Sequence, residues 1–199
     1  MIAVIVLAAG KSSRSTPENK LLALAQDGRT MIAQTVDHAV ASGAGAVIVV
    51  TGHQAERIRN ALSEKPVSFV HASDFAEGIA ASLRGGIAAL ESHIEAALIC
   101  LGDMPLVEPS MMRHIIAAYD PGQGREIILP TYQDQRGNPV LWGRRFFPEL
   151  LKLTGDSGGR GILPRHKRFI TEIPVGSEGV RLDFDTPDEL ATFKNRHMR

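Results

Sequence analysis

Three cationic side chains near the start of the chain have the spacing of an anion-binding loop. Lys11, Arg14 and Lys20 lie close together, and they follow the continuous aliphatic run from Ile2 to Leu7. Such a run is typical of a strand inside a parallel sheet that is covered on both faces. Gly10 and the small residues beside it leave backbone N–H groups open to a ligand, and such groups favour phosphate. The segment therefore predicts a loop that holds a polyphosphate.

Acidic side chains follow in two places from which they could reach the same ligand. Asp103 comes after the aliphatic segment Leu98–Leu101, at the carboxyl end of a predicted strand, where open α/β sheets bind ligands. Asp183 and Asp185 alternate along an extended segment, so they share one side of it and at least one could face the crevice. Both places also have a plain structural explanation. Asp103 fits a Gly-Asp-x-Pro turn, and Asp185 precedes a Thr-Pro helix start.

The first two thirds of the chain supply the elements that would position these groups. Aliphatic runs of strand length alternate with segments of helical period, which is the pattern of an α/β fold with a mostly parallel central sheet flanked by helices. The predicted strands lie near Ile2–Leu7, Ala46–Thr51, Val67–His71, Ala96–Leu101 and Ile127–Thr131. The predicted helices lie near Thr30–Ser42, Gln54–Leu62, Gly78–Ser92 and Pro109–Tyr119.

Beyond Pro130 the alternation becomes irregular, because Gly and Pro separate short elements. The elements predicted there are a strand at Pro139–Trp142, helical pieces at Phe146–Leu153 and Gly158–Leu163, a strand at Phe169–Ile173, and a last helix from Thr186 and Pro187 to about Arg196. No repeat, low-complexity segment or linker divides the chain, and 199 residues suit one domain. We therefore expect a single Rossmann-like domain over residues 1–199.

Composition limits the classes of partner. The 22 basic and 22 acidic residues give a formal net charge of +0, so no overall field draws the protein to nucleic acid or to a membrane surface. No apolar run reaches the roughly 18 residues of a membrane span, and the start lacks the pattern of a signal peptide. Cys100 is the only cysteine and cannot form an intramolecular disulfide. These features predict a cytoplasmic protein without nucleic-acid or membrane partners, whose anion binding is local.

The first loop matches neither of the two commonest phosphate motifs. The Walker loop and the dinucleotide fingerprint both need a second nearby glycine, and none follows Gly10 before Gly28. Residues 7–14 read Leu-Ala-Ala-Gly-x-Ser-x-Arg, and residues 19–22 read Asn-Lys-Leu-Leu. With Gly-Asp-Met-Pro at 102–105 and Asp-Phe-Asp-Thr-Pro at 183–187, this set resembles the MobA-like group of nucleotidyltransferases, particularly its molybdenum cofactor cytidylyltransferases.

The resemblance implies a nucleotidyltransferase fold and roles for the residues of these motifs. Asp103 and Asp185 would be the ligands of a Mg²⁺ ion, which suits two carboxylates beside phosphate oxygens. Arg14, Lys20 and Asp103 would carry catalysis. The segment at 78–86, which alone is an ordinary amphipathic helix start, would lie near the base and ribose. The residues implied to bind the nucleotide are Leu7, Ala8, Ala9, Gly10, Lys11, Ser12, Arg14, Lys20, Gly78 and Ser82.

Two glycine-rich segments in the second half extend the resemblance. Residues 136–140 and 155–161 are similar to the elements that face the acceptor substrate in this group, although each alone is simply a turn. Together they offer backbone N–H groups, an amide and a guanidinium to a second anionic ligand. The residues implied to bind the acceptor are Gly137, Asn138, Pro139, Asp156, Gly158 and Arg160.

The reaction that the resemblance implies transfers CMP from CTP to the terminal phosphate of the molybdenum cofactor (molybdopterin) and releases pyrophosphate. Ala9 stands where relatives that use GTP tend to have Gly, so its methyl group favours CTP. The enzymatic alternative uses GTP or another phosphorylated acceptor, such as a sugar or alcohol phosphate. The alternative from another class is a non-catalytic maturation factor that carries the cofactor. A molybdenum hydroxylase or its maturation factor would be the protein partner.

Overall fold

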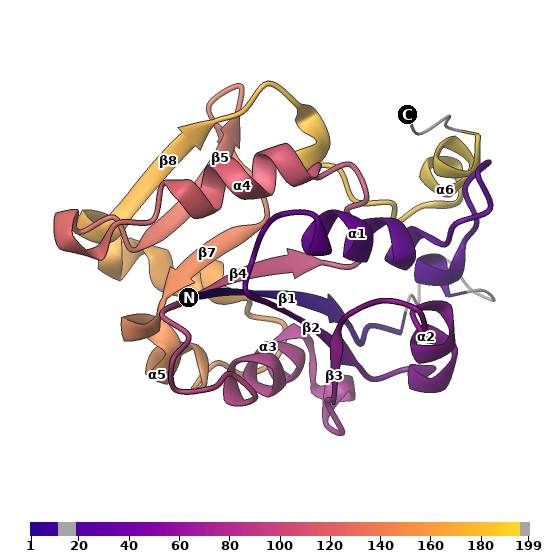
Figure 1. Cartoon of the computed structure of the whole chain (residues 1–199), viewed down its shortest axis with the longest axis horizontal. Coiled ribbons are helices and arrows are strands. Elements are labelled where there is room, and N and C mark those ends of the chain that lie inside the picture. Colours follow the sequence, from indigo (N-terminus) through magenta and orange to yellow (C-terminus); the bar gives the residue numbers. More distant parts are fainter. Residues whose placement is uncertain (12–18, 196–199) are drawn as a thin grey trace.

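A computed structural model, which describes residues 1–11 and 19–195, has one eight-stranded sheet at its centre (Figure 1). The half of the sheet formed by the start of the chain is parallel throughout, in the order β3-β2-β1-β4. Its strands are β1 (Ile2–Ala8), β2 (Ala46–Thr51), β3 (Ser68–His71) and β4 (Ala96–Leu101). The predicted α/β fold with a mostly parallel central sheet is thus confirmed.

Antiparallel pairs extend the sheet beyond β4. Strand β7 pairs with β4 on one side and with β5 on the other, both in antiparallel orientation, and β5 also pairs with β6 and β8. Only the pair of β5 with β8 is parallel in this half. The strands are β5 (Ile127–Tyr132), β6 (Gln135–Arg136), β7 (Val140–Gly143) and β8 (Ile170–Pro174). The two-residue β6 was not predicted, because a strand that short carries no periodicity.

Helices cover both faces of the sheet. One face packs against α1, α2, α4 and α6, and the other against α3, α5 and the 3-10 helix Gly159–Phe169 (Figure 1). None of the helices in the described ranges is long and apolar enough to cross a membrane. The α-helices are α1 (Met31–Val40), α2 (Ala55–Ala61), α3 (Ile79–Ala88), α4 (Pro109–Ala117), α5 (Phe147–Leu150) and α6 (Pro187–Lys194).

The continuous aliphatic sequence of β1 follows from this two-sided burial. Val4 and Val6 belong to the core on the α1 side, whereas Ile5 and Leu7 belong to the core on the α3 side. All four are buried, with exposed fractions of 9% or less. Each face therefore takes every second side chain, as the period of a strand requires.

The structure corrects the predicted bounds of several helices. Helix α3 ends at Ala88 instead of Ser92, because the Arg144 guanidinium binds the carbonyl oxygens of Glu91 and Ile94 in the turn that follows. The helical piece predicted at Phe146–Leu153 is the shorter α5, preceded by a 3-10 turn. The piece predicted at Gly158–Leu163 is a 3-10 helix that continues to Phe169.

Candidate active site

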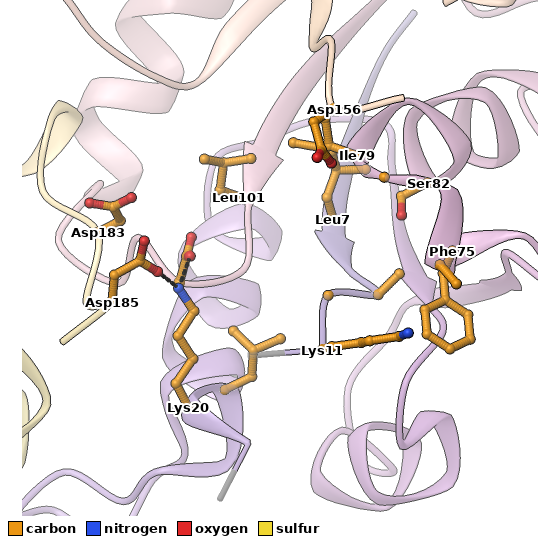
Figure 2. Close-up of a pocket in the computed structure, with 16 residues that line it drawn as sticks. Leu7, Lys11, Lys20, Phe75, Ile79, Ser82, Leu101, Asp156, Asp183 and Asp185 are labelled. Atoms are coloured by element: carbon orange, nitrogen blue, oxygen red, sulfur yellow. Dashed lines mark hydrogen bonds and ion pairs between the residues drawn. The ribbon is translucent and has the colours of Figure 1, made fainter. Parts of the chain in front are cut away.

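A crevice of about 510 Å³ opens at the carboxyl ends of β1 and β4 (Figure 2). This is the place where open α/β sheets bind ligands. Most of the predicted nucleotide-binding and metal-binding residues meet there. The lining residues are Leu7, Ala9, Gly10, Lys11, Lys20, Leu21, Phe75, Ala76, Gly78, Ile79, Ser82, Leu101, Asp103, Asp156, Asp183 and Asp185. Ala8, the last residue of β1, is buried in the core instead.

Lys20 joins the two carboxylates at one end of the crevice. It begins the 3-10 turn Lys20–Leu22, which the Asn19 side chain caps by accepting a hydrogen bond from the Leu21 N–H at 3.1 Å. The Lys20 ammonium donates to Asp103 Oδ2 at 2.5 Å and to Asp185 Oδ1 (Figure 2). Only 10% of the Lys20 side chain is exposed, so these ion pairs are largely shielded from water.

Asp183 makes this end of the crevice a cluster of three carboxylates. One oxygen each of Asp103, Asp183 and Asp185 lies within 4.8 Å of the others. Partial desolvation, with repulsion from Asp103 and Asp185, raises the pKa of Asp183. Burial disfavours the charged Lys20, but its ion pairs with Asp103 and Asp185 outweigh this penalty and raise the pKa of Lys20. The three carboxylates outnumber the one ammonium that contacts the cluster, so the cluster as a whole is negatively charged.

The cluster fits a divalent metal ion. Carboxylate oxygens are the ligands that hard dications prefer, and an ion between two or three of them would remove their mutual repulsion. The Asp103 Oδ1 atom is buried and has no hydrogen-bond partner among the residues that the structure describes. A buried carboxylate oxygen without a donor is costly, and a metal ion would satisfy it.

An aromatic side chain closes the opposite end of the crevice. The Phe75 ring faces the cavity beside Ser82, and the Lys11 ammonium lies 5.9 Å from the ring centroid (Figure 2). Phe75 packs over Gly52, where a Cβ atom would come within 2.6 Å of the ring. Phe75 is not predictable from the sequence, since a single aromatic residue in a short 3-10 turn has no spacing to mark it.

Gly78 connects this end of the crevice to the segment 155–156. Its φ of +116° lies in a region that favours glycine, and a Cβ atom there would lie 2.5 Å from both Asp156 Oδ1 and the Gly155 carbonyl. The Gly155 carbonyl accepts a hydrogen bond from the Ala80 N–H at 3.1 Å. Two segments that were predicted to bind different substrates therefore meet at the start of α3.

A second cavity, of about 420 Å³, continues from the crevice along the sheet. The two share Leu7, Ile79, Leu101 and Asp156, so they adjoin each other. The side chains that line only the second cavity are mostly apolar, with polar groups at its rim. They are Leu83, Ile99, Asn138, Val140, Trp142, Gly158, Gly159 and Arg160.

Some of the predicted site residues have other positions. Gly137 and Pro139 line neither of these cavities. A Cβ atom on Gly137 would lie 2.5 Å from the Val180 carbonyl, so this glycine permits a close contact between two loops. Ser12 and Arg14 lie outside the described residues.

Comparison with known proteins agrees with this geometry. Residues 4–169 match the MobA-like NTP transferase domain. The chain is 25% identical over 194 residues to the molybdenum cofactor cytidylyltransferase of Escherichia coli K12, and the match covers 97% of this chain and 95% of that protein. It is 29% identical over 187 residues, or 92% of its length, to the bifunctional protein GlmU of Desulfotalea psychrophila, of which it spans 52%.

A solved structure overlays almost the whole chain. The crystal structure of Rv0371c from Mycobacterium tuberculosis is 32% identical, with a TM-score of 0.85 and coverage of 97% of this chain and 96% of that one. A second crystal structure of Rv0371c, in complex with manganese, gives a TM-score of 0.80, with 97% of each chain covered. Since the family match covers most of the sequence and this relative shares the complete fold, the chain belongs to the MobA-like NTP transferase family of nucleotidyltransferases.

Proposed function

We propose that the protein transfers CMP from CTP to the terminal phosphate of the molybdenum cofactor. The observation that carries the proposal is the cluster of Lys20, Asp103 and Asp185 in a crevice that shares four of its lining residues with a second cavity. A nucleotidyltransferase needs two adjoining sites, because its two substrates must react with each other. The choice of the molybdenum cofactor is supported by the relative from Escherichia coli, whose match extends over nearly both full chains.

The reaction is a displacement at the α-phosphorus of CTP. An oxygen of the acceptor phosphate forms a bond to that phosphorus, the bond to the β-phosphate oxygen breaks, and pyrophosphate leaves. Asp103 and Asp185 would hold a Mg²⁺ ion, which offsets the charge that develops on the phosphate oxygens. Lys20, together with Arg14, would bind the β- and γ-phosphates, while backbone N–H groups near Gly10 orient the triphosphate. No protein nucleophile takes part.

The base and ribose would occupy the end of the crevice that holds Phe75. Ser82 offers a hydroxyl there, and Gly78 allows the segment 155–156 to approach closely. Ala9 is almost completely buried and lines the same end, next to the Gly52 position on which Phe75 packs. A methyl group at Ala9 narrows the space for the base, which favours the smaller cytosine.

The second cavity suits an acceptor with a flat apolar body and polar edges. Val140 and Trp142 give it apolar walls, whereas Asn138, Asp156 and Arg160 supply an amide, a carboxylate and a guanidinium at the rim. A pterin ring has this distribution of faces and hydrogen-bonding edges. Arg160 would bind the acceptor's anionic group, and Asp156 would accept from N–H groups of the ring.

The test is incubation of the protein with one NTP at a time, Mg²⁺ and molybdenum cofactor, followed by mass analysis of the product and measurement of pyrophosphate. We expect cytosine dinucleotide and pyrophosphate in equal amounts with CTP, and much less product with GTP. Asp103→Asn should abolish both. Asp188→Asn is the matched control, since Asp188 is exposed at the start of α6 and lines neither cavity.

The other outcomes separate the alternatives. Product with GTP alone would assign guanylyl transfer instead. Bound cofactor without pyrophosphate from any NTP would indicate a non-catalytic carrier. A reaction with sugar or alcohol phosphates, but not with molybdenum cofactor, would leave the nucleotide half of the proposal standing and overturn the acceptor.

A further inference from the structure

Lys20 occupies the position between the carboxylates where a metal ion would bind. Its ammonium contacts Asp103 Oδ2 and Asp185 Oδ1, which belong to two of the three carboxylates in the cluster (Figure 2). Side-chain exposure is 17% for Asp103 and 23% for Asp185, so water solvates each carboxylate only weakly. Without a cation between them, these two groups and Asp183 would repel one another.

The backbone that carries Lys20 is held by hydrogen bonds, and its side chain lines the crevice. The Ala23 N–H donates to the Lys20 carbonyl at 3.0 Å, and the Asn19 side chain holds the N–H of the next residue, Leu21. The crevice of about 510 Å³ lies directly beside the ammonium. A change of side-chain rotamer can therefore carry the charge from the carboxylates into the crevice without unfolding the turn.

We propose that Lys20 holds the place of the divalent ion in the nucleotide-free protein, so that ion binding depends on the triphosphate drawing Lys20 away. The inference rests on the proposed use of a nucleoside triphosphate in this crevice. Lys20 is then a positioning residue in the free protein, where it keeps Asp103 and Asp185 together. It becomes a phosphate-binding residue once the nucleotide arrives.

The exchange makes ion and nucleotide binding cooperative. The ammonium already offsets the charge of the two carboxylates that would hold the ion, so the free protein binds the ion weakly. A triphosphate offers the ammonium new partners and adds oxygen ligands for the ion. By linkage, the ion must raise the affinity for the nucleotide by the same factor as the nucleotide raises the affinity for the ion.

The direct test is to titrate the nucleotide-free protein with Mn²⁺. Binding is measured by calorimetry and by the loss of the electron paramagnetic resonance signal of free Mn²⁺. Lys20→Met removes the charge and keeps the length of the side chain. We expect it to bind Mn²⁺ about ten- to a hundred-fold more tightly than the wild type, which is the range for one charge-assisted contact. Lys11→Met is the matched control, because it removes a cation from the same crevice that makes no ion pair with the cluster. Its Mn²⁺ affinity should change by less than about twofold.

Lys20→Arg keeps the charge and should keep Mn²⁺ affinity near that of the wild type. Unfolding curves of each variant identify any that do not fold. Equal or weaker Mn²⁺ binding by folded Lys20→Met would overturn the proposal, as would an equal gain in Lys11→Met. Failure of the proposed function would show separately, as absence of dinucleotide product, since Mn²⁺ titration needs neither acceptor nor turnover.

Discussion

Substitution of Gly78 should destabilise the protein through a contact that the structure makes explicit. Gly78 has φ of +116° and ψ of −177°, a backbone conformation that is essentially restricted to glycine. In Gly78→Ala, the new methyl group would lie 2.5 Å from the Asp156 carboxylate and from the backbone of Gly155. Because the neighbour is partly backbone, the clash cannot be relieved by a side-chain rotation alone.

The magnitude follows from two contributions. The backbone strain costs about 1 to 3 kcal/mol, and loss of the hydrogen bond from Ala80 N–H to the Gly155 carbonyl costs about 0.5 to 1.5 kcal/mol. The free energy of unfolding should therefore fall by about 1.5 to 4.5 kcal/mol. Gly85→Ala in the same helix is the control. Its methyl group would meet its nearest atoms at 3.8 to 4.0 Å, so the variant should gain about 0.5 to 1 kcal/mol from helix propensity.

Urea unfolding, followed by circular dichroism, measures both variants. In Gly78→Ala, the new methyl group should also displace Asp156. This displacement should raise the KM for the acceptor, because Asp156 lines the second cavity as well as the crevice. If Gly78→Ala were as stable as Gly85→Ala, the close approach of segment 155–156 to α3 would be refuted. Normal stability with a raised acceptor KM would instead show that the segment moves freely.

Three further results are expected. Ala9→Gly should raise the ratio of GTP product to CTP product in a competition assay. The increase should be at most the one that corresponds to about 1 to 3 kcal/mol, and an unchanged ratio would place base selection elsewhere. Asp185→Asn should reduce turnover more than Asp183→Asn, since Asp185 contacts Lys20 directly, and the reverse order would exchange their roles. Burial lowers the pKa of His38, so protons bind preferentially to the unfolded chain below about pH 6.5 and stability should fall there as the pH decreases. His38→Gln should reduce that fall in urea unfolding at pH 7 and pH 5.5.

Most of the parallel half of the fold could be predicted from the sequence, because most of its strands and helices are long enough to show a hydrophobic pattern. Strands β1, β2 and β4 are continuous, mostly aliphatic runs, whereas β3 reads Ser-Phe-Val-His and is only partly buried. Threonine side chains cap the starts of two helices. Thr30 caps α1 through a hydrogen bond from the Ala33 N–H, and Thr186 forms a capping box with Glu189 at α6. The second half gave weaker signals, because its short strands and 3-10 turns are set by contacts between loops.

The meeting of Asp103 with the first loop was also predictable, since both follow parallel strands that end at the same edge of the sheet. The pairing of Lys20 with both carboxylates was not. It depends on the 3-10 turn that Asn19 caps, whereas the motif alone predicts contacts of Lys20 with phosphates. The position of Phe75 was not predictable either, because it depends on a contact between distant residues: the ring packs where Gly52 has no side chain.

The contact between Gly137 and Val180 joins the loop of Asn138 to the segment that leads to Asp183. The Asn138 N–H donates to the Val180 carbonyl at 2.7 Å, and a Cβ atom on Gly179 would lie 2.6 Å from the Leu106 carbonyl. The backbone that leads to Asp183 is therefore held between the loop of Asn138 and the loop that follows Asp103. A larger residue at 137 would push Asn138 away from Val180, and it would shift the segment that carries Asp183 and Asp185.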